Sequence, residues 1–330
     1  MTTRAVVAGL GTYVPETVLT NHDLEKMVDT SDEWIVTRTG IRERHIASQD
    51  ETTSSMAGEA ARLALRDAQL TPEDLDFIVC ATNTPDTIFP STAARVQHQL
   101  TDKPIPGVDL QAGCTGLIYG MEMASALIQS KAYHNILVIG ADKLTSITDY
   151  EDRTTAVLFG DAAGAFVLQA KEGTDFGILG SYLQADGRGT DLLIQPGGGS
   201  LMPASRESVE SRQHYLKMNG NETFRFAVKA LPEAVEEGLK RAGLKVEDMD
   251  LLVPHQANLR IIDAAVRRFE LDAERVVVNI DRYGNTSVAT IPLALHEARL
   301  EGRLHDGDIV VLCAFGAGLT WGSNVIRWGR

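Results

Sequence analysis

The sequence predicts an α/β protein built from two similar halves, and three observations lead to this fold class. The segment LTPEDLDFIVCATNTP, which begins at Leu70, returns 174 residues later as LKVEDMDLLVPHQAN, which begins at Leu244. The same spacing relates ILVIGA, from Ile136, to VVLCAF, from Val310, and both runs are typical of buried parallel strands. Amphipathic helical patterns lie between such runs, which indicates an α/β architecture with parallel sheets.

The helical pattern appears in four segments: residues 55–68, 116–130, 224–242 and 259–269. A chain of 330 residues is long enough for two domains. We therefore expect two halves, residues 1–175 and 176–330, that pack together. A glycine-rich stretch, residues 185–200, contains apolar residues and indicates a loop rather than a domain linker.

The composition is that of an ordinary folded protein, with 44% apolar and 23% charged residues. A formal net charge of -14 argues against a general attraction to nucleic acid, which requires a basic face. The apolar stretches are far shorter than the ~20 residues of a membrane helix, and the first residues lack the pattern of a secretory signal. We therefore expect a cytoplasmic protein that binds neither nucleic acid nor membrane.

The three cysteines have neither the close spacing of a zinc site nor the number of a disulfide framework. We expect free thiols, no bound metal and no resident cofactor. Cys80 and Cys313 end apolar runs, which is typical of small core residues. Cys114 differs, because in VDLQAGCTGLIYG a short β-prone run meets small residues and then a helical pattern. That context predicts a thiol at a helix N-terminus, where the helix dipole favours the thiolate.

His255 and Asn285 are the other two candidate catalytic residues. His255 follows an apolar run that ends in Pro254, and strand ends are where α/β folds place reacting groups. Asn285 follows the β-prone run 276–280 just as Cys114 follows the run 108–110, at nearly the repeat spacing. The local sequence predicts a turn at Asn285, with Thr286 or Ser287 capping a helix.

Two glycine patterns share part of the dinucleotide-binding fingerprint. Residues 9–11 read Gly-Leu-Gly after an apolar run, and residues 316–318 read Gly-Ala-Gly. Val14 and Trp321 occupy the third glycine position of the two patterns. These departures argue against a nicotinamide-dependent enzyme.

Taken together, these residues resemble the β-ketoacyl-acyl carrier protein synthase III family, which starts bacterial fatty acid synthesis within the thiolase superfamily. The resemblance extends over essentially the whole chain. Its signature segments occur in the family's order: SDEWIVTRTGIRERHIA from Ser31, GCTGLIYG around Cys114, VLFGDAAGA from Val157, HQANLRII from His255, NTSVATIPLAL from Asn285 and FGAGLTWGS from Phe315.

The resemblance implies a fold and a reaction. The fold would be thiolase-like, with two similar halves in a five-layered αβαβα arrangement. The catalytic set would be Cys114, His255 and Asn285. An acyl group would pass from coenzyme A to Cys114, and decarboxylation of malonyl-acyl carrier protein would supply the carbanion that attacks it. The products would be 3-ketoacyl carrier protein, coenzyme A and carbon dioxide, with the coenzyme A thioester acting as substrate and not as cofactor.

The resemblance also implies several binding roles. The backbone N–H groups of Cys114 and Ala317 would form an oxyanion hole. Coenzyme A would be bound by Trp34, Arg38, Arg153 and Asn258. The carrier protein would dock on Arg225 and Arg260. In a homodimer, Phe89 would line the acyl pocket of the partner. The chain departs from the family pattern at Gly113, Ala162, Ala317 and Arg225. Of these, Ala317 matters most, because its backbone N–H can serve the oxyanion hole only if the φ angle at this position is one that alanine can adopt.

Rival functions remain open at this point. The chain could be a condensing enzyme of secondary metabolism with a different primer, or a cysteine thioester hydrolase that admits water to the acyl-enzyme. A non-catalytic acyl-binding protein is disfavoured, because all three reacting residue types are present. The primer could be acetyl, a branched acyl group or a longer chain, since the depth of the pocket depends on packing.

Overall fold

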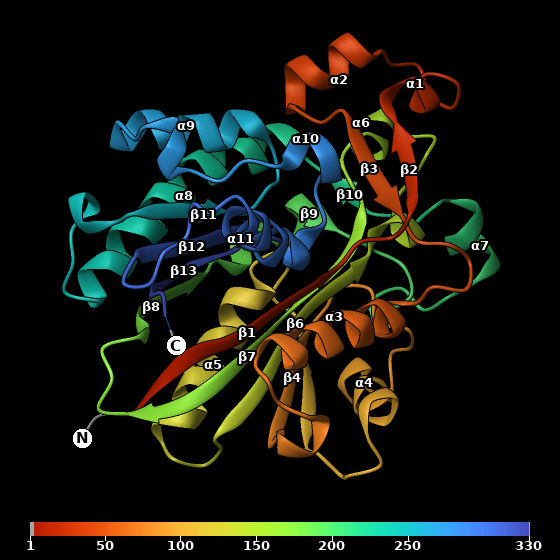
Figure 1. Ribbon diagram of the computed structural model, residues 1–330. Helices are drawn as coiled ribbons and strands as arrows, with labels where there is room; N and C mark the ends of the chain where they lie inside the picture. Colours follow the sequence, from red (N-terminus) through yellow and green to blue (C-terminus); the bar gives the residue numbers. More distant parts are fainter. Residues whose placement is uncertain (1–2, 330) are drawn as a thin grey trace.

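The computed structural model describes residues 3–329, and the sequence repeat is visible in its two main sheets (Figure 1). The first sheet has five strands in the order β1 (Thr3–Tyr13), β7 (Asp161–Glu172), β6 (Asn135–Lys143), β4 (Phe77–Ala81) and β5 (Gly107–Leu110). The second has four strands in the order β8 (Gly177–Ala185), β13 (Thr320–Arg327), β12 (Ile309–Gly316) and β11 (Leu251–Pro254). The repeated segments therefore occupy equivalent positions: β4 matches β11, and β6 matches β12.

Within residues 3–329, the second sheet has no fifth strand. Residues 276–280 were predicted to match β5, but they form only one parallel bridge, between Leu252 and Val276. The pairing stops because the backbone N–H of Asn279 donates to the Gln256 side chain at 3.1 Å. The chain then enters the short helix α10 (Ile280–Tyr283). This part of the prediction is wrong, while the strand predicted at 108–110 is confirmed.

Both sheets are mixed and not wholly parallel as predicted. Strand β4 runs parallel to β5 and β6, and β11 runs parallel to β12. Strands β1, β7, β13 and β8 pair antiparallel to their neighbours. In the second half, β12 and β13 are separated by only three residues, and so short a connection can join only antiparallel strands.

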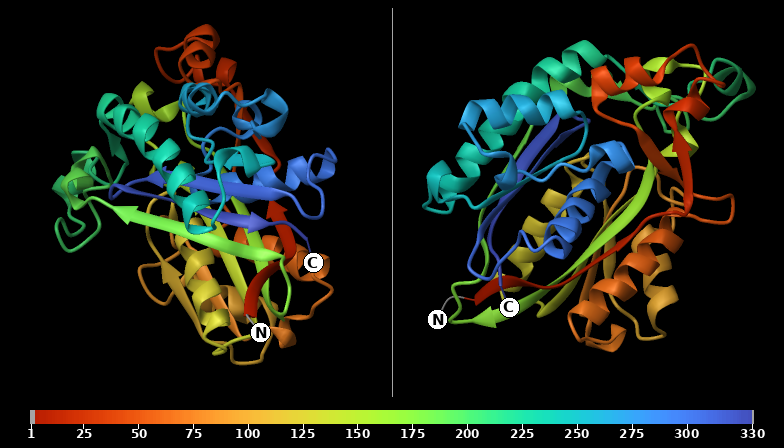
Figure 2. Two further views of the ribbon diagram at one scale, coloured as in Figure 1. Left: turned by 90° about the vertical axis from the view of Figure 1, so that its left-hand side faces the viewer. Right: turned by 45° about the horizontal axis from the view of Figure 1, so that its top comes forward.

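Helices complete five layers, which confirms the αβαβα arrangement (Figures 1 and 2). One outer layer holds α3 (Thr53–Asp67) and α4 (Thr92–Leu100), and the other holds α8 (Gly220–Arg241) and α9 (Leu259–Phe269). The central layer, between the two sheets, holds α5 (Gly116–Gln129) and α11 (Thr290–Leu300). All four helices predicted from the sequence are present, with ends that shift by a few residues.

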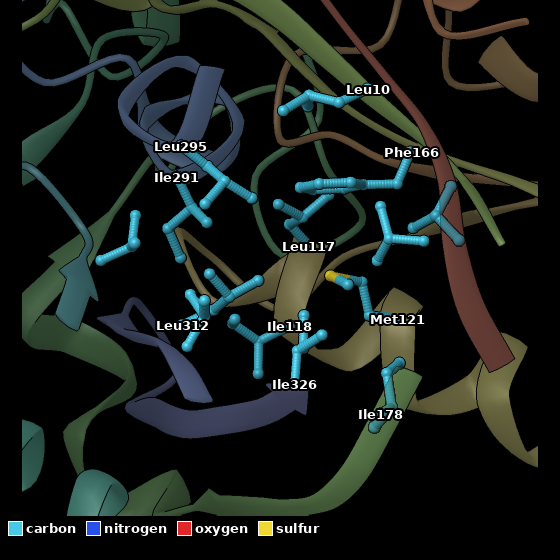
Figure 3. Close-up of a cluster of buried hydrophobic side chains, with 14 of the residues drawn as sticks. Leu10, Leu117, Ile118, Met121, Phe166, Ile178, Ile291, Leu295, Leu312 and Ile326 are labelled. Atoms are coloured by element: carbon cyan, nitrogen blue, oxygen red, sulfur yellow. The ribbon is translucent and has the colours of Figure 1, made fainter. Parts of the chain in front are cut away.

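The central layer carries the largest apolar core. Leu117, Ile118 and Met121 of α5 are fully buried, and they pack in one cluster with Ile291 and Leu295 of α11 (Figure 3). A helix that contacts a sheet on each side must be apolar on most of its surface. Both central helices thus hold the loops at their N-terminal ends in fixed positions, and those loops carry Cys114 and Asn285.

The remaining elements lie beyond the sheets, at the end where β2, β3 and α2 appear in Figure 1. They are β2 (Thr17–Thr20), α1 (Asn21–Leu24), α2 (Asp32–Thr39), β3 (Glu43–Ile46), α6 (Arg153–Ala156), β9 (Leu193–Ile194), α7 (Arg206–Glu210) and β10 (Lys217–Met218). The loop predicted at 185–200 contains a 3-10 helix (Gly187–Leu192) and the short strand β9, which pairs with β10. It connects elements and does not link domains.

Every strand of the first sheet comes before residue 173, and every strand of the second comes after residue 176. The division at 175 stays a prediction, because both halves share the core described above. Within residues 3–329, no helix combines the length and the apolar character required to cross a membrane.

Candidate active site

A cavity of about 190 Å³ brings the predicted catalytic residues together. Cys114, His255 and Asn285 all line it. The wall also includes Trp34, Arg38, Thr154, Phe159, Leu193, Met218, Phe224, Asn258, Ile261, Phe315 and Gly316. Residues from both halves of the chain therefore enclose one site, as the repeat predicted.

Cys114 lies between β5 and α5, one residue before the helix N-cap Thr115. Gly113 has φ +54°, a left-handed conformation that glycine adopts without strain. This conformation turns the chain sharply from the strand into the helix. The predicted position at a helix N-terminus is confirmed.

Burial acts on the charge state of Cys114. Burial raises the pKa of its thiol to about 12, although a hydrogen bond from Ser287 and one from backbone lower it. The residue is partly accessible from the cavity, but the protein atoms around the sulfur still desolvate a thiolate. In the resting site this desolvation opposes the effect of the donors, so the thiolate expected at the helix N-terminus stays a prediction.

Ser287 contacts the nucleophile and was missed as a site residue. Its Oγ lies 3.4 Å from Cys114 Sγ as a hydrogen-bond donor. The sequence had assigned Thr286 or Ser287 to a helix cap, but the 3-10 helix that follows Thr286 has no side-chain cap bond. Only the left-handed φ of Ser287, +53°, directs its side chain to the sulfur, and no sequence pattern signalled that conformation.

His255 follows β11 directly and is 1% exposed. Its Nδ1 lies 2.7 Å from Thr290 Oγ1, and the ring contacts Phe315 edge-on. Burial lowers the pKa of His255 to about 3, so the imidazole is neutral. Thr290 Oγ1 also lies 3.0 Å from the Ser287 carbonyl, and its single proton can be donated to only one of these two partners. When it donates to the carbonyl, Nδ1 carries the imidazole proton; when it donates to Nδ1, the proton is on the other ring nitrogen, which can then donate.

Asn285 is fixed at both its backbone and its side chain. Its N–H donates to Leu158 at 2.9 Å, and its carbonyl accepts from Gly160 at 3.1 Å. Its Oδ1 accepts the N–H of Ser287 at 2.9 Å. Because one side of the amide is engaged, the Nδ2 amino group is directed away from Ser287 and remains a donor for the cavity.

The two candidate oxyanion donors lie in loops that interlock. A β-carbon added to Gly316 would come within 2.4 Å of the backbone N of Cys114, and one added to Gly113 within 2.5 Å of that of Ala317. Glycine at both positions therefore permits the close approach. Ala317 is not among the residues with positive φ, so its methyl group is accommodated and its N–H is retained.

Three of the four candidate coenzyme A residues line the cavity, Trp34, Arg38 and Asn258, while Arg153 lies beside Trp34 without lining it. The guanidinium carbons of Arg38 and Arg153 lie 5.8 Å and 5.3 Å from the centre of the Trp34 ring. Asn258 has another use for its side chain, because Oδ1 accepts from Arg260 N and Nδ2 donates to the Arg38 carbonyl. These two hydrogen bonds connect α2 to the start of α9 and stabilise this part of the cavity wall.

A wider hollow of about 600 Å³ adjoins this wall and shares Trp34, Thr154, Met218 and Gly220 with it. Its other lining residues include Asp191, Lys217, Asn219 and Asn221, which the sequence analysis did not single out. These positions come from the 3-10 helix 187–192, from β10 and from the start of α8. Only the fold brings them beside Trp34.

Arg225 of α8 and Arg260 of α9 are exposed on neighbouring helices. Arg225 forms an ion pair with Glu222 at 2.7 Å, and the Arg260 guanidinium lies 5.2 Å from the ring centre of Phe224, a wall residue. Phe89 is 82% exposed and lies apart from the cavity wall in the single chain. Cys80 and Cys313 are fully buried core residues, as predicted.

Comparisons with known proteins agree in one family. A model described as 3-oxoacyl-[acyl-carrier-protein (ACP)] synthase III matches residues 108–187, and one for the C-terminal part of that synthase matches residues 239–328. A curated beta-ketoacyl-[acyl-carrier-protein] synthase III from Symbiobacterium thermophilum is 56% identical, covering 98% of both chains. One from Caldanaerobacter subterraneus subsp. tengcongensis is 53% identical, covering 99% of this chain and 98% of the relative.

The solved structures agree with the curated relatives. The synthase III of Thermus thermophilus is similar with a TM-score of 0.91 and 49% identity, covering 98% of this chain and 99% of that one. The synthase III of Aquifex aeolicus gives 0.90 and 47%, covering 98% and 100%. Full-length identity near one half, joined to the same fold, confirms the resemblance. The chain belongs to the β-ketoacyl-acyl carrier protein synthase III family of condensing acyltransferases.

Proposed function

We propose that this chain condenses an acyl-CoA primer with malonyl-acyl carrier protein. In the first half-reaction, Cys114 sulfur attacks the thioester, the acyl group moves to sulfur, and the thiol proton leaves with coenzyme A. In the second, the malonyl thioester loses carbon dioxide, and the resulting carbanion attacks the acyl carbon. Cys114 thiolate then leaves, and 3-ketoacyl carrier protein is released.

The observation that best supports this function is the neighbour of His255. A hydrolase would more often pair its histidine with a carboxylate, which stabilises an imidazolium. Here the Nδ1 partner is the Thr290 hydroxyl, and burial keeps the ring neutral. With its proton on the other ring nitrogen, His255 is a neutral donor that suits the enolate oxygen developing during decarboxylation, and the Asn285 amide is a second such donor.

Two measured products distinguish condensation from hydrolysis. With acyl-CoA and malonyl-acyl carrier protein together, we expect carbon dioxide and 3-ketoacyl carrier protein in equal amounts. With acyl-CoA alone, we expect one acyl group per chain and little free acid. Steady release of free acid without carbon dioxide would instead assign the chain to the thioester hydrolases.

The proposal for coenzyme A gives a first prediction. Adenine would insert between the Trp34 indole and an arginine, and the other arginine would meet phosphate. Trp34→Ala should therefore raise the KM for acyl-CoA about tenfold, because a base stacked on an aromatic ring contributes ~1 to 3 kcal/mol. Trp34→Phe keeps an aromatic face and should lie between wild type and alanine. An unchanged KM in Trp34→Ala would remove this residue from coenzyme A binding.

We also propose that the carrier protein docks over Arg225 and Arg260. Their exposure beside wall residue Phe224 supports this position, since the carrier must deliver its arm to the cavity. Local basic side chains would attract an acidic partner although the whole chain is acidic.

Charge reversal tests that surface. Arg260→Glu should raise the KM for malonyl-acyl carrier protein roughly tenfold at low ionic strength and less at high salt, where charges are screened. The KM for acyl-CoA should change little. Arg267→Glu is the matched control, because it makes the same charge change on an exposed residue of α9. Equal effects of the two variants, or on both substrates, would contradict docking at Arg260.

A homodimer is the proposed assembly. Strand β5 is the free edge of the first sheet, and residues 107–109 on it are exposed. Asp109 of this strand accepts hydrogen bonds from Thr92 and Ala93, which lie just after the loop that carries Phe89. Pairing of two β5 edges would satisfy their open backbone groups and cover Phe89, which could then reach the partner's acyl pocket.

Light scattering at micromolar concentration tests the dimer. Val108→Lys places a charge on the β5 edge and should shift the protein toward monomer with loss of activity. Val18→Lys is the control, since Val18 is a strand valine of β2 with 40% exposure against 38% for Val108. A fully active wild-type monomer would contradict the proposal. The cytoplasmic location and the identity of the primer stay predictions of the sequence.

A further inference from the structure

A buried polar chain leads from Asp142 to the nucleophile. Asp142 is fully buried at the end of β6, and its Oδ1 accepts the backbone N–H groups of Asn83 at 2.6 Å and Thr84 at 3.1 Å. The hydroxyls of Thr82 and Thr84 donate to the same oxygen at 3.0 Å each. Its Oδ2 lies 2.9 Å from Asn83 Nδ2. Because donors surround both oxygens, the Asp142 carboxyl acts only as a hydrogen-bond acceptor in these contacts.

Asn83 connects Asp142 to Ser287 through its side-chain amide and thereby orients the Ser287 hydroxyl. Its Nδ2 has two protons, and it lies 2.9 Å from Asp142 Oδ2 and 3.2 Å from Ser287 Oγ. Since an amide nitrogen only donates, Ser287 Oγ is the acceptor in this contact. Its own proton is then available for Cys114 Sγ at 3.4 Å.

The backbone of Ser287 is held in an unusual conformation to make this contact. Its φ is +53°, where a non-glycine residue is uncommon and strained. The bond from its N–H to Asn285 Oδ1 at 2.9 Å supports the conformation. This backbone conformation places the Ser287 hydroxyl beside the reacting sulfur.

We propose that Ser287 is a further catalytic residue, which donates a hydrogen bond to Cys114 Sγ, and that Asn83 is the positioning residue that orients it. This role rests on the proposed function. In the first half-reaction the donor increases the fraction of thiolate. In the second, the C–Sγ bond of the acyl-enzyme breaks and its electron pair returns to sulfur. The same donor then stabilises the leaving thiolate.

The other groups around the sulfur do not replace this donor. His255 shares the cavity wall, but its side-chain hydrogen bond is to Thr290 and not to the sulfur, and the negative charge of Asp142 raises the pKa of the Cys114 thiol. Asp142 is the competing acceptor: burial raises the pKa of its carboxyl, and a hydrogen bond from Ser287 is among the contacts that oppose this rise. If the Ser287 hydroxyl donated to Asp142 instead, the Cys114 sulfur would lack this donor. The two arrangements predict different alkylation rates for Cys114.

Alkylation of Cys114 by iodoacetamide tests the proposal without any acyl substrate. Ser287→Gly removes the hydroxyl and suits the positive φ, so the backbone is retained. We expect its Cys114 to react roughly tenfold more slowly at a fixed pH of about 8, because a hydrogen bond to a charged group is worth about one pKa unit. Ser287→Ala should react equally slowly, since it also lacks the hydroxyl. Peptide mass mapping identifies Cys114 as the labelled residue.

Two further variants separate this role from a structural one. Ser323→Ala removes another buried serine, whose hydroxyl donates to Ala234 at 2.6 Å, and should leave the alkylation rate of Cys114 unchanged. Asn83→Ala should slow alkylation in wild type but have no further effect in Ser287→Gly, because Asn83 acts through the hydroxyl.

Wild-type alkylation rates in both Ser287 variants would overturn the role of Ser287. Additive effects of Asn83→Ala and Ser287→Gly would overturn that of Asn83. These results are independent of the condensation assay. Should wild type fail to form an acyl adduct while Ser287→Gly still slows alkylation, the proposed function would be wrong and the contact right.

Discussion

Cys114→Ala is expected to abolish both the acyl adduct and the 3-ketoacyl product. Loss of a nucleophile typically costs on the order of 10⁶-fold in rate, because no other group can form the covalent intermediate. Intact-protein mass spectrometry after exposure to acyl-CoA measures the adduct, and a carbon dioxide assay measures turnover. Cys80→Ala and Cys313→Ala are the controls, since both cysteines are fully buried. An acyl label on either of them would overturn the assignment.

The same adduct reveals how the thiol ionises. With the pKa of Cys114 raised to about 12, the thiolate fraction at neutral pH is small and rises tenfold for each pH unit. The rate of adduct formation should therefore increase with unit slope between about pH 6 and pH 9. A plateau near neutral pH would mean that the helix N-terminus lowers the pKa as the sequence suggested.

His255→Ala and Asn285→Ala are expected to reduce carbon dioxide release by ~10²- to 10³-fold each, while acyl transfer to Cys114 changes less. Decarboxylation places negative charge on the malonyl thioester oxygen, and each residue supplies one donor aimed at it. Loss of a single oxyanion donor typically has this effect. Both half-reactions are measured on folded protein, with folding checked by circular dichroism.

A sharper variant is available at Asn285. Asn285→Asp keeps an oxygen that can accept the N–H of Ser287 but loses the amino donor. It should therefore be as slow in decarboxylation as the alanine variant while the loop remains in place. A purely structural role predicts the reverse, with normal decarboxylation by the folded fraction of every variant. That outcome would remove the pair from the mechanism.

The sequence predicted the parts of the site that a repeat and local chemistry can reveal. The repeat placed Cys114 and Asn285 at equivalent turns, and the apolar run before Pro254 placed His255 at a strand end. The structure confirms that all three line one cavity. These inferences succeeded because strand ends and helix starts are set by short-range patterns.

Other features depend on distant contacts and could not be read from the chain. The contact of Ser287 with Cys114 requires a left-handed φ that a serine rarely adopts. The raised pKa of Cys114 depends on how closely the surrounding residues pack. The second sheet ends without a fifth strand where the backbone N–H of Asn279 donates to the side chain of Gln256.

The central helix layer makes the two halves of the chain depend on each other for burial of apolar surface. Residues of α5 and α11 form one cluster with strands of both sheets, so each half covers apolar surface of the other. Cut apart, each half would expose Met121 or Leu295 and its neighbours to water. The sequence repeat thus describes two similar structural halves, while the shared apolar core makes their folding mutually dependent.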